Sequence, residues 1–449
     1  MAQNIQLSDH FTYPKLIRFT LPSILMMIFT SIYSVVDGVF VSNFVGKTSF
    51  AAVNLMFPFL MMLGVAGFML GTGGSALVAK MLGEGRKEKA KGVFTMLVVV
   101  GFAISCLLSI IGVASLRPVA KLMGAEGQLF DDCLLYGRIL MISLPFFTLQ
   151  NIFQPFMVAA ERPQLGLIVT IFAGVMNILF DFLLIVVFKM GLSGAAWATV
   201  AAETTGGAIP LVYFALPNKS PLRFIKPDFD MQALFQSLFN GLSEFFSSIS
   251  GTIVSMCYNY QLMKYLGENG VAAYGVIMYV QFIFFAVFLG FAIGSSPIVS
   301  YNYGSKNNAE LRNVYVKSLK IMAVLGLILT ISMEVFSYPL TKLFVGYDAR
   351  LHSITLTAFR IYGLSYLLVG LNFYTSSFFT ALNNGLVSAV LSTTRALIFE
   401  TSAIFVIPAI FGVKGIWFAV LCAEAATLIL SVYFLNRYKE RYGYVVRLQ

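Results

Sequence analysis

The feature that most constrains this chain is a run of 18 residues, Phe19 to Val36, in which no side chain carries a charge. At about 1.5 Å of rise per residue, a helix of this length crosses the hydrocarbon core of a bilayer. Apolar residues continue beyond Asp37, and the next charged residue is Lys47. The pattern therefore predicts a membrane-spanning helix with Asp37 in its distal half, where a carboxylate costs about 3 kcal/mol to insert and usually serves a function. The alternative is that Asp37 marks the wet end of a helix that tilts little.

The rest of the chain has the same character. Of its 449 residues, 58% are hydrophobic and 11% are charged, whereas soluble domains carry about 25% charged residues. We therefore predict an all-α polytopic membrane protein with twelve transmembrane helices. The apolar segments that we assign to them cover residues 15–41, 49–79, 92–115, 131–159, 163–188, 191–215, 233–263, 270–300, 313–337, 352–382, 386–411 and 413–435.

The distribution of positive charge predicts the orientation of these helices. The net charge is +10, but the basic residues lie between apolar spans, so they indicate topology and not a nucleic-acid partner. If both termini are cytoplasmic, about two thirds of the 30 Lys and Arg residues lie on the inner side, as the positive-inside rule requires. The polar residues before the first span do not have the form of a cleaved signal peptide, so we expect none.

The two halves of the chain resemble each other at an offset of 221 residues. This offset aligns Gly83 with Gly304, Gly191 with Gly412, and Glu203 with Glu424. A unit of six helices keeps its orientation when it is repeated, so the halves should be parallel repeats with a cavity between them near the midplane. Close helix packing alone would also retain the glycines. We predict an N lobe at 1–216, a cytoplasmic linker at 217–231 and a C lobe at 232–449.

Several motifs, taken in order, resemble the multidrug and toxic compound extrusion (MATE) family. The likeness covers essentially the whole chain, and the start of the seventh span, Gly-Leu-Ser followed by Glu244, is similar to the MepA-type branch. The other matching stretches are Pro22 to Gly38, Gly71-Thr-Gly-Gly-Ser75, Gly83-Glu-Gly-Arg-Lys-Glu-Lys-Ala90, Asn177-x-x-x-Asp181 and Gly191-x-x-Gly194-Ala-Ala-Trp197.

This resemblance implies V-shaped N and C lobes of six helices each. It also implies an H⁺- or Na⁺-coupled antiporter that exports amphipathic, often cationic compounds from a bacterial cytoplasmic membrane. We expect a monomer that is not an enzyme and has no cofactor, since the sequence contains no nucleophile–base pair, phosphate-binding loop or metal motif. The alternatives are a lipid-linked precursor flippase, a major-facilitator-type transporter, and a membrane receptor or scaffold that transports nothing.

The candidate coupling site lies in the outer half of the N lobe. Counted from the outer residues Lys47 and Lys189, Asp37 and Asp181 lie at a similar depth, and Asn177 is one helical turn from Asp181. Two carboxylates with neighbouring oxygens can share a proton or hold Na⁺. In the family that the chain resembles, the first-helix Asp and the fifth-helix Asn/Asp pair belong to the cation site. We assign this role to Asp37, Asn177 and Asp181, which would be the metal ligands if the ion is Na⁺, with Asn151 and Thr199 as further members. The alternative is a hydrogen-bond cluster that only holds helices together.

The candidate substrate-binding residues lie in the second half of the chain, and they are Glu244, Gln281, Asn372 and Arg395. Glu244 falls in the inner half of the seventh span, where it would attract a cationic compound or pair with Arg395 at a comparable depth. Gln281 and Asn372 fall near the middle of their spans and would line the cavity or bond to neighbouring helices. Glu203 and Glu424 would act as coupled gates or as packing groups.

Overall fold

Residues 5–445 of the computed structural model are described here, and within them all regular structure is helical. The predicted all-α fold is therefore confirmed. The elements are α1 (Tyr13–Phe40), η1 (Val41–Val45), α2 (Lys47–Gly83), α3 (Lys87–Leu122), α4 (Gly127–Ala159), α5 (Pro163–Asp181), η2 (Phe182–Val187), α6 (Leu192–Ala215), α7 (Met231–Asn240), α8 (Leu242–Leu266), α9 (Glu268–Gly304), α10 (Asn308–Val345), α11 (Ala349–Gly363), α12 (Tyr366–Ala381), α13 (Gly385–Thr393), η3 (Thr394–Glu400), α14 (Thr401–Phe411) and α15 (Val413–Tyr442), where η marks a π-helical segment.

Twelve membrane spans can be assigned to these helices. Within residues 5–445, nine helices are long and apolar enough to cross a membrane, and α11 with α12 makes a tenth span that is bent by 48°. The shorter α6 and α8 lie alongside them, α6 against α4 and α5, and α8 against α9 and α13. Large apolar side chains such as Ile110, Phe235 and Ile429 are more than two thirds exposed, which suits a surface that faces lipid.

Two spans that the sequence predicts as continuous are broken, and two more, 163–188 and 386–411, contain a π-helical segment. Segment 233–263 breaks at Gly241 between α7 and α8, and segment 352–382 breaks between α11 and α12. Segment 386–411 contains the π-helical η3. Apolar patterning did not predict these features. Hydropathy indicates whether a segment can lie in a membrane, but not whether its backbone hydrogen bonds follow one continuous α-helical pattern.

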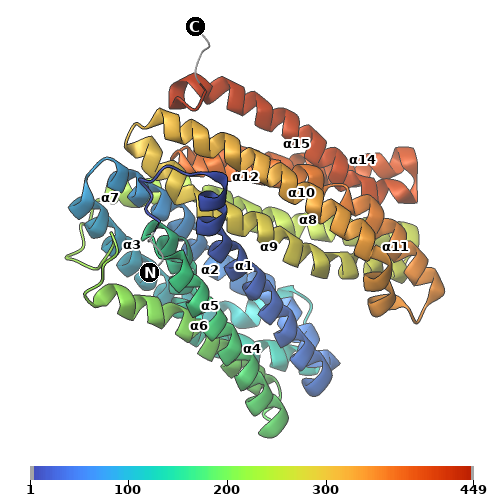
Figure 1. Ribbon diagram of the computed structural model, residues 1–449. Helices are drawn as coiled ribbons and strands as arrows, with labels where there is room; N and C mark the ends of the chain where they lie inside the picture. Colours follow the sequence, from blue (N-terminus) through green and yellow to red (C-terminus); the bar gives the residue numbers. More distant parts are fainter. Residues whose placement is uncertain (1–4, 446–449) are drawn as a thin grey trace.

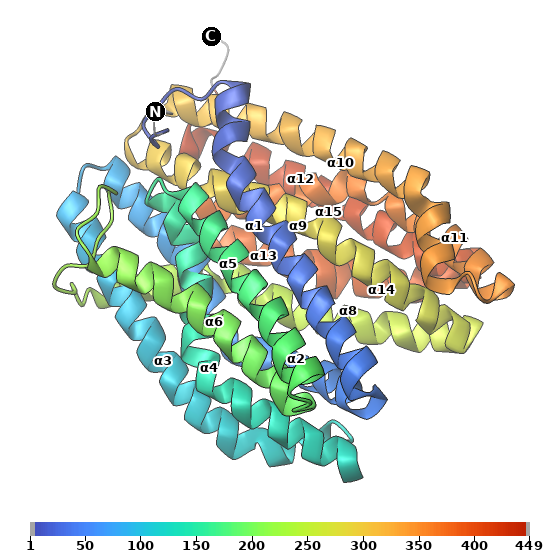
Figure 2. The ribbon, with the colours of Figure 1, turned by 60° about the horizontal axis from the view of Figure 1, so that its bottom comes forward.

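The helices form two groups that lie side by side (Figures 1 and 2). We call α1–α6 the N lobe and α7–α15 the C lobe; they meet where α1 and α2 pack against α9. The lobes touch near the end that holds both termini and spread apart towards the other end, in the predicted V shape. Gly191 and Gly412, equivalent in the predicted repeat, have nearly the same positive φ, 61° and 63°, which favours glycine. The boundaries 1–216, 217–231 and 232–449 remain a prediction.

The segment between α6 and α7 is packed against the N lobe. The Asp228 backbone N–H donates to the Gly92 carbonyl oxygen over 3.1 Å, and the Ile225 N–H donates to Thr95 Oγ1 over 3.2 Å. Phe224 stacks on Phe94 with ring centroids 5.3 Å apart. The predicted linker therefore runs along α3 instead of hanging free between the lobes.

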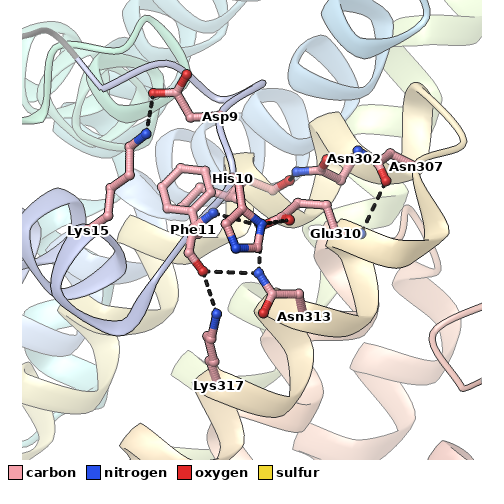
Figure 3. Close-up of polar contacts among 10 residues, drawn as sticks. Asp9, His10, Phe11, Lys15, Asn302, Asn307, Glu310, Asn313 and Lys317 are labelled. Atoms are coloured by element: carbon pink, nitrogen blue, oxygen red, sulfur yellow. Dashed lines mark hydrogen bonds and ion pairs between the residues drawn. The ribbon is translucent and has the colours of Figure 1, made fainter.

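The segment before α1 is fixed to the beginning of α10 (Figure 3). Glu310 accepts a hydrogen bond from the Phe11 backbone N–H over 2.8 Å and lies 2.6 Å from Nδ1 of His10. The Phe11 carbonyl oxygen accepts from Lys317 Nζ over 2.7 Å and from Asn313 Nδ2 over 3.0 Å. We call residues 5–12 the N-terminal strap.

The same strap also contacts the N lobe. The Leu7 backbone N–H donates to Oε1 of Glu161, in the turn between α4 and α5, over 2.8 Å. Burial raises the pKa of Glu161, although this hydrogen bond favours its charged form. Leu7 and Phe11 are fully buried. The strap thus bridges both lobes at the end of the molecule that holds the termini.

Candidate functional site

Two aspartates meet inside the N lobe, where α1 packs against α5. The carboxyl groups of Asp37 and Asp181 lie within hydrogen-bonding reach of each other. Both oxygens of Asp181 and Oδ1 of Asp37 are buried and have no donor among the described residues. Two ionised carboxylates cannot donate, so a hydrogen bond between them forms only when one carries a proton. The arrangement is therefore suited to holding a single proton or a cation.

Further oxygens surround this pair. Asn177 is buried, and its Oδ1 has no partner among the described residues. Thr199 on α6 lies near the Tyr136 hydroxyl. Tyr136 in turn lies close enough to Asp37 and Asp181 to interact with their charges. The structure thus brings Asp37 and Asp181 together, with Asn177 one helical turn from Asp181, whereas the Thr199 hydroxyl donates to the Ala195 carbonyl oxygen of its own helix over 3.1 Å.

A third carboxylate belongs to the same interior region. Glu203 on α6 accepts a hydrogen bond from Ser143 Oγ over 2.5 Å, and it lies close enough to Asp37 for their charges to interact. None of the ion pairs within residues 5–445 involves Asp37, Asp181 or Glu203. Three acidic groups therefore share an apolar interior without a basic neighbour in contact.

Asn151 has a different role in the structure. Its Nδ2 donates to the Phe147 carbonyl oxygen of its own helix over 2.8 Å. Among the described residues, no hydrogen bond joins Asn151 to Asp37 or Asp181. We find no group of three His, Cys, Asp or Glu side chains in residues 5–445 that is placed to hold a metal ion. A Na⁺ ion would therefore need amide or hydroxyl ligands such as those of Asn177 and Thr199.

A cavity of about 310 Å³ opens on the C-lobe side of the lobe interface. Its wall includes Glu244, Gln281, Asn372 and Arg395, which are the four residues predicted to bind substrate. Helix α2 completes the wall with Thr72 and Ser75. None of the five predicted coupling residues lines this cavity. The two candidate sites are therefore separate.

Arg395 pairs with a carboxylate other than Glu244. Its Nε donates to Oε1 of Glu424 over 2.8 Å, and Oε2 of Glu424 accepts from Asn372 Nδ2 over 2.7 Å. The alternative in which Glu244 pairs with Arg395 is therefore wrong. Glu244 instead lines the cavity with Thr72 of α2, across the lobe interface, and the Thr72 hydroxyl donates to the Phe68 carbonyl oxygen over 2.9 Å.

Two further polar residues of this cavity, Tyr362 and Glu400, are not among those predicted from the sequence. Tyr362 lines the wall and donates its hydroxyl to Oε1 of Gln281 over 2.6 Å. Glu400, the last residue of η3, also lines the wall. An acidic residue in an apolar span is a signal that the sequence does contain. Glu400 shares its apolar span with Arg395, and the sequence does not show which of the two charges faces a cavity.

The fold and these sites define a two-lobed helical membrane transporter. The MatE family model matches the chain twice, over residues 22–183 and 244–405, so the matches begin 222 residues apart. The chain belongs to the MatE family, the MATE transporters that its motifs resemble. The double match supports the predicted repeat, and the major-facilitator alternative is set aside.

Proteins of known name and structure agree with this assignment. The chain is 22% identical to the multidrug export protein MepA of Staphylococcus saprophyticus over 94% of both chains, and 20% identical to that of Staphylococcus haemolyticus over 96% of this chain and 94% of the other. Among solved structures, a multidrug resistance MATE family transporter in an outward-facing conformation superposes with a TM-score of 0.92 at 20% identity, covering 99% of this chain and 100% of that one. A transporter of the MOP superfamily from Pyrococcus furiosus gives 0.90 at 21% identity, covering 98% and 99%.

Proposed function

We propose that this protein is a cation-coupled antiporter that exports amphipathic, cationic compounds across a bacterial plasma membrane. The observation that carries the proposal is the pair of Asp181, which is fully buried, and Asp37, whose Oδ1 is buried against it; the pair has no basic partner in contact among the described residues and lies apart from the cavity. The named relatives are multidrug export proteins, which supports a substrate of this class. We expect the protein to act as a monomer in the bilayer.

In this mechanism, H⁺ or Na⁺ binds at Asp37 and Asp181 from the outer side. Binding changes the balance between lobe arrangements only if the cation has a higher affinity for one of them. The compound occupies the cavity around Glu244 in the other step of the cycle. A pH gradient of one unit supplies about 1.4 kcal/mol per proton, and the membrane potential supplies about 2.3 kcal/mol per charge per 100 mV.

The proposal is tested with purified protein in liposomes that contain ethidium, with proton and sodium gradients imposed separately. We expect one of the gradients to drive ethidium transport and Asp37→Asn to abolish that transport. Asp131→Asn, an exposed carboxylate at the start of α4, is the matched control and should transport normally. No transport under either gradient, or full transport by Asp37→Asn, would refute the proposal. Movement of a lipid headgroup probe without ethidium transport would favour a flippase.

A further inference from the structure

Glu400 is an acidic residue of the cavity that the function described above does not use. It is the last residue of the π-helical segment η3, and its half-buried side chain lines the cavity wall. Among the described residues, its carboxylate takes part in no hydrogen bond and in no ion pair within 4 Å. A carboxylate at membrane depth that bonds to nothing and faces a cavity is available to a ligand.

The nearby positive charge is already engaged. Arg395 is close enough to Glu400 to interact electrostatically, but its hydrogen bond goes to Glu424, which is almost fully buried. The other carboxylate oxygen of Glu424 accepts a hydrogen bond from Asn372, so both oxygens of Glu424 have a donor. Arg395 is therefore hydrogen-bonded to only one of the two carboxylates, and among the described residues Glu400 stands in the cavity wall with Glu244 without a basic side chain bonded to it.

The aromatic lining supports the same interpretation. Tyr274 and Tyr362 line the cavity and lie close enough to Glu400 to interact with its charge. Phe285 and Phe373 line it as well and pack edge to face with centroids 4.8 Å apart. Aromatic faces attract organic cations that have lost part of their hydration. The cavity volume of about 310 Å³ lies at the small end of ligand pockets, so it has room for one organic cation at a time.

We propose that Glu400 is a specificity-determining residue that makes the cavity select hydrophobic organic cations. Arg395, the one arginine that residues 5–445 contribute to the wall, is bonded to Glu424, and this leaves Glu400 to face the positive centre of the ligand. The inference deepens the proposed function and rests on it for the identity of the cavity as the substrate site. It makes no use of the coupling residues Asp37 and Asp181.

The test measures the binding of two probes to the purified protein in detergent, without a gradient. The probes are tetraphenylphosphonium and tetraphenylborate, which have a similar shape and opposite charges. We expect Glu400→Gln to weaken tetraphenylphosphonium binding about tenfold, the effect of one charge at an intermediate dielectric. Tetraphenylborate should bind equally or more tightly. Glu400→Asp keeps the charge and should retain most of the cation affinity, and Glu268→Gln, at an exposed site, is the control.

Equal losses for both probes, or an unchanged affinity for tetraphenylphosphonium, would overturn the role of Glu400. If Glu400→Gln does not fold, Glu400→Ala, which also removes the carboxylate, takes its place and must lose affinity for the phosphonium but not for the borate. Because binding is measured without a gradient, failure of ion coupling leaves this result intact. Conversely, the protein could show normal gradient-driven transport and yet bind both probes equally well. That result would refute the role of Glu400 and leave the proposed antiport function intact.

Discussion

Gly83 and Gly304, equivalent residues of the two halves, each lie against the main chain of the other's helix. A Cβ atom on Gly83 would overlap the carbonyl oxygen of Tyr301, and one on Gly304 would overlap that of Lys80. These contacts join the ends of α2 and α9. Because no other residue lacks a Cβ, the two glycines allow the backbones to approach closely enough to shut this end of the molecule.

We therefore expect Gly83→Ala and Gly304→Ala to favour arrangements in which this end is open. The added methyl groups meet main-chain atoms, which cannot move aside as a flexible side chain can. Distances between spin labels placed on the ends of α2 and α9 should lengthen or broaden. Gly275→Ala in the same helix α9, where no atom lies within 4 Å of the added Cβ, is the matched control. Unchanged distances in both variants would mean that the contact does not hold this end closed.

The N-terminal strap should reinforce the same closure. Glu310→Ala removes the acceptor of the Phe11 N–H and the contact with His10. Bonds to a charged acceptor contribute about 1.5–3 kcal/mol each, so the strap should detach more often. Limited proteolysis of residues 5–12 should accelerate by tenfold or more, whereas Glu126→Ala, an exposed acidic site, should leave the rate unchanged. A strap that remains protected in Glu310→Ala would contradict this role.

The sequence predicted the spans and the repeat, and it placed Asp37 and Asp181 at a similar depth, because charges in apolar runs stand out and their depth follows from helical rise. The role of these two residues in ion coupling stays a prediction. The sequence did not indicate which way each helix faces. Asn151 is an example. Counting residues from the flanking charges gives its depth in the membrane, but not the direction in which its side chain points. Most of the apolar window of α4 is buried, so this helix has no wide lipid-facing side from which that direction could be inferred. The partner of Arg395 was also missed, because pairing depends on how η3 rotates against α15.

The pair of Arg395 and Glu424 should contribute to folding. Removing one partner of a buried ion pair costs about 3–5 kcal/mol, since it leaves the other charge uncompensated. We expect Arg395→Met and Glu424→Gln each to lower the thermal unfolding temperature in detergent. The double variant should lose less than the sum of the two single losses. Strictly additive losses would show that the two side chains do not stabilise each other.

Equivalent inner loops should lie on the same side of the membrane. The test starts from a variant in which the four native cysteines are replaced, namely Cys106, Cys133, Cys257 and Cys422. A single cysteine placed at Glu84 or at Ser305 should then not react with impermeant thiol reagents in intact cells. It should react once the cells are permeabilised. The expectation follows from the 221-residue repeat and from the excess of basic residues on this side. Labelling of either position in intact cells would contradict the predicted topology, in which these loops are cytoplasmic.

The most direct measurement of the central claim is gradient-driven efflux by Asp37→Asn, Asp181→Asn and the double variant. Because members of one site do not act independently, each single variant should abolish efflux and the double variant should be little worse. Binding of the exported compound without a gradient should largely survive, since neither aspartate lines the cavity. Thermal stability should remain close to that of the unaltered protein. Full efflux by Asp37→Asn under an imposed proton or sodium gradient would contradict the account.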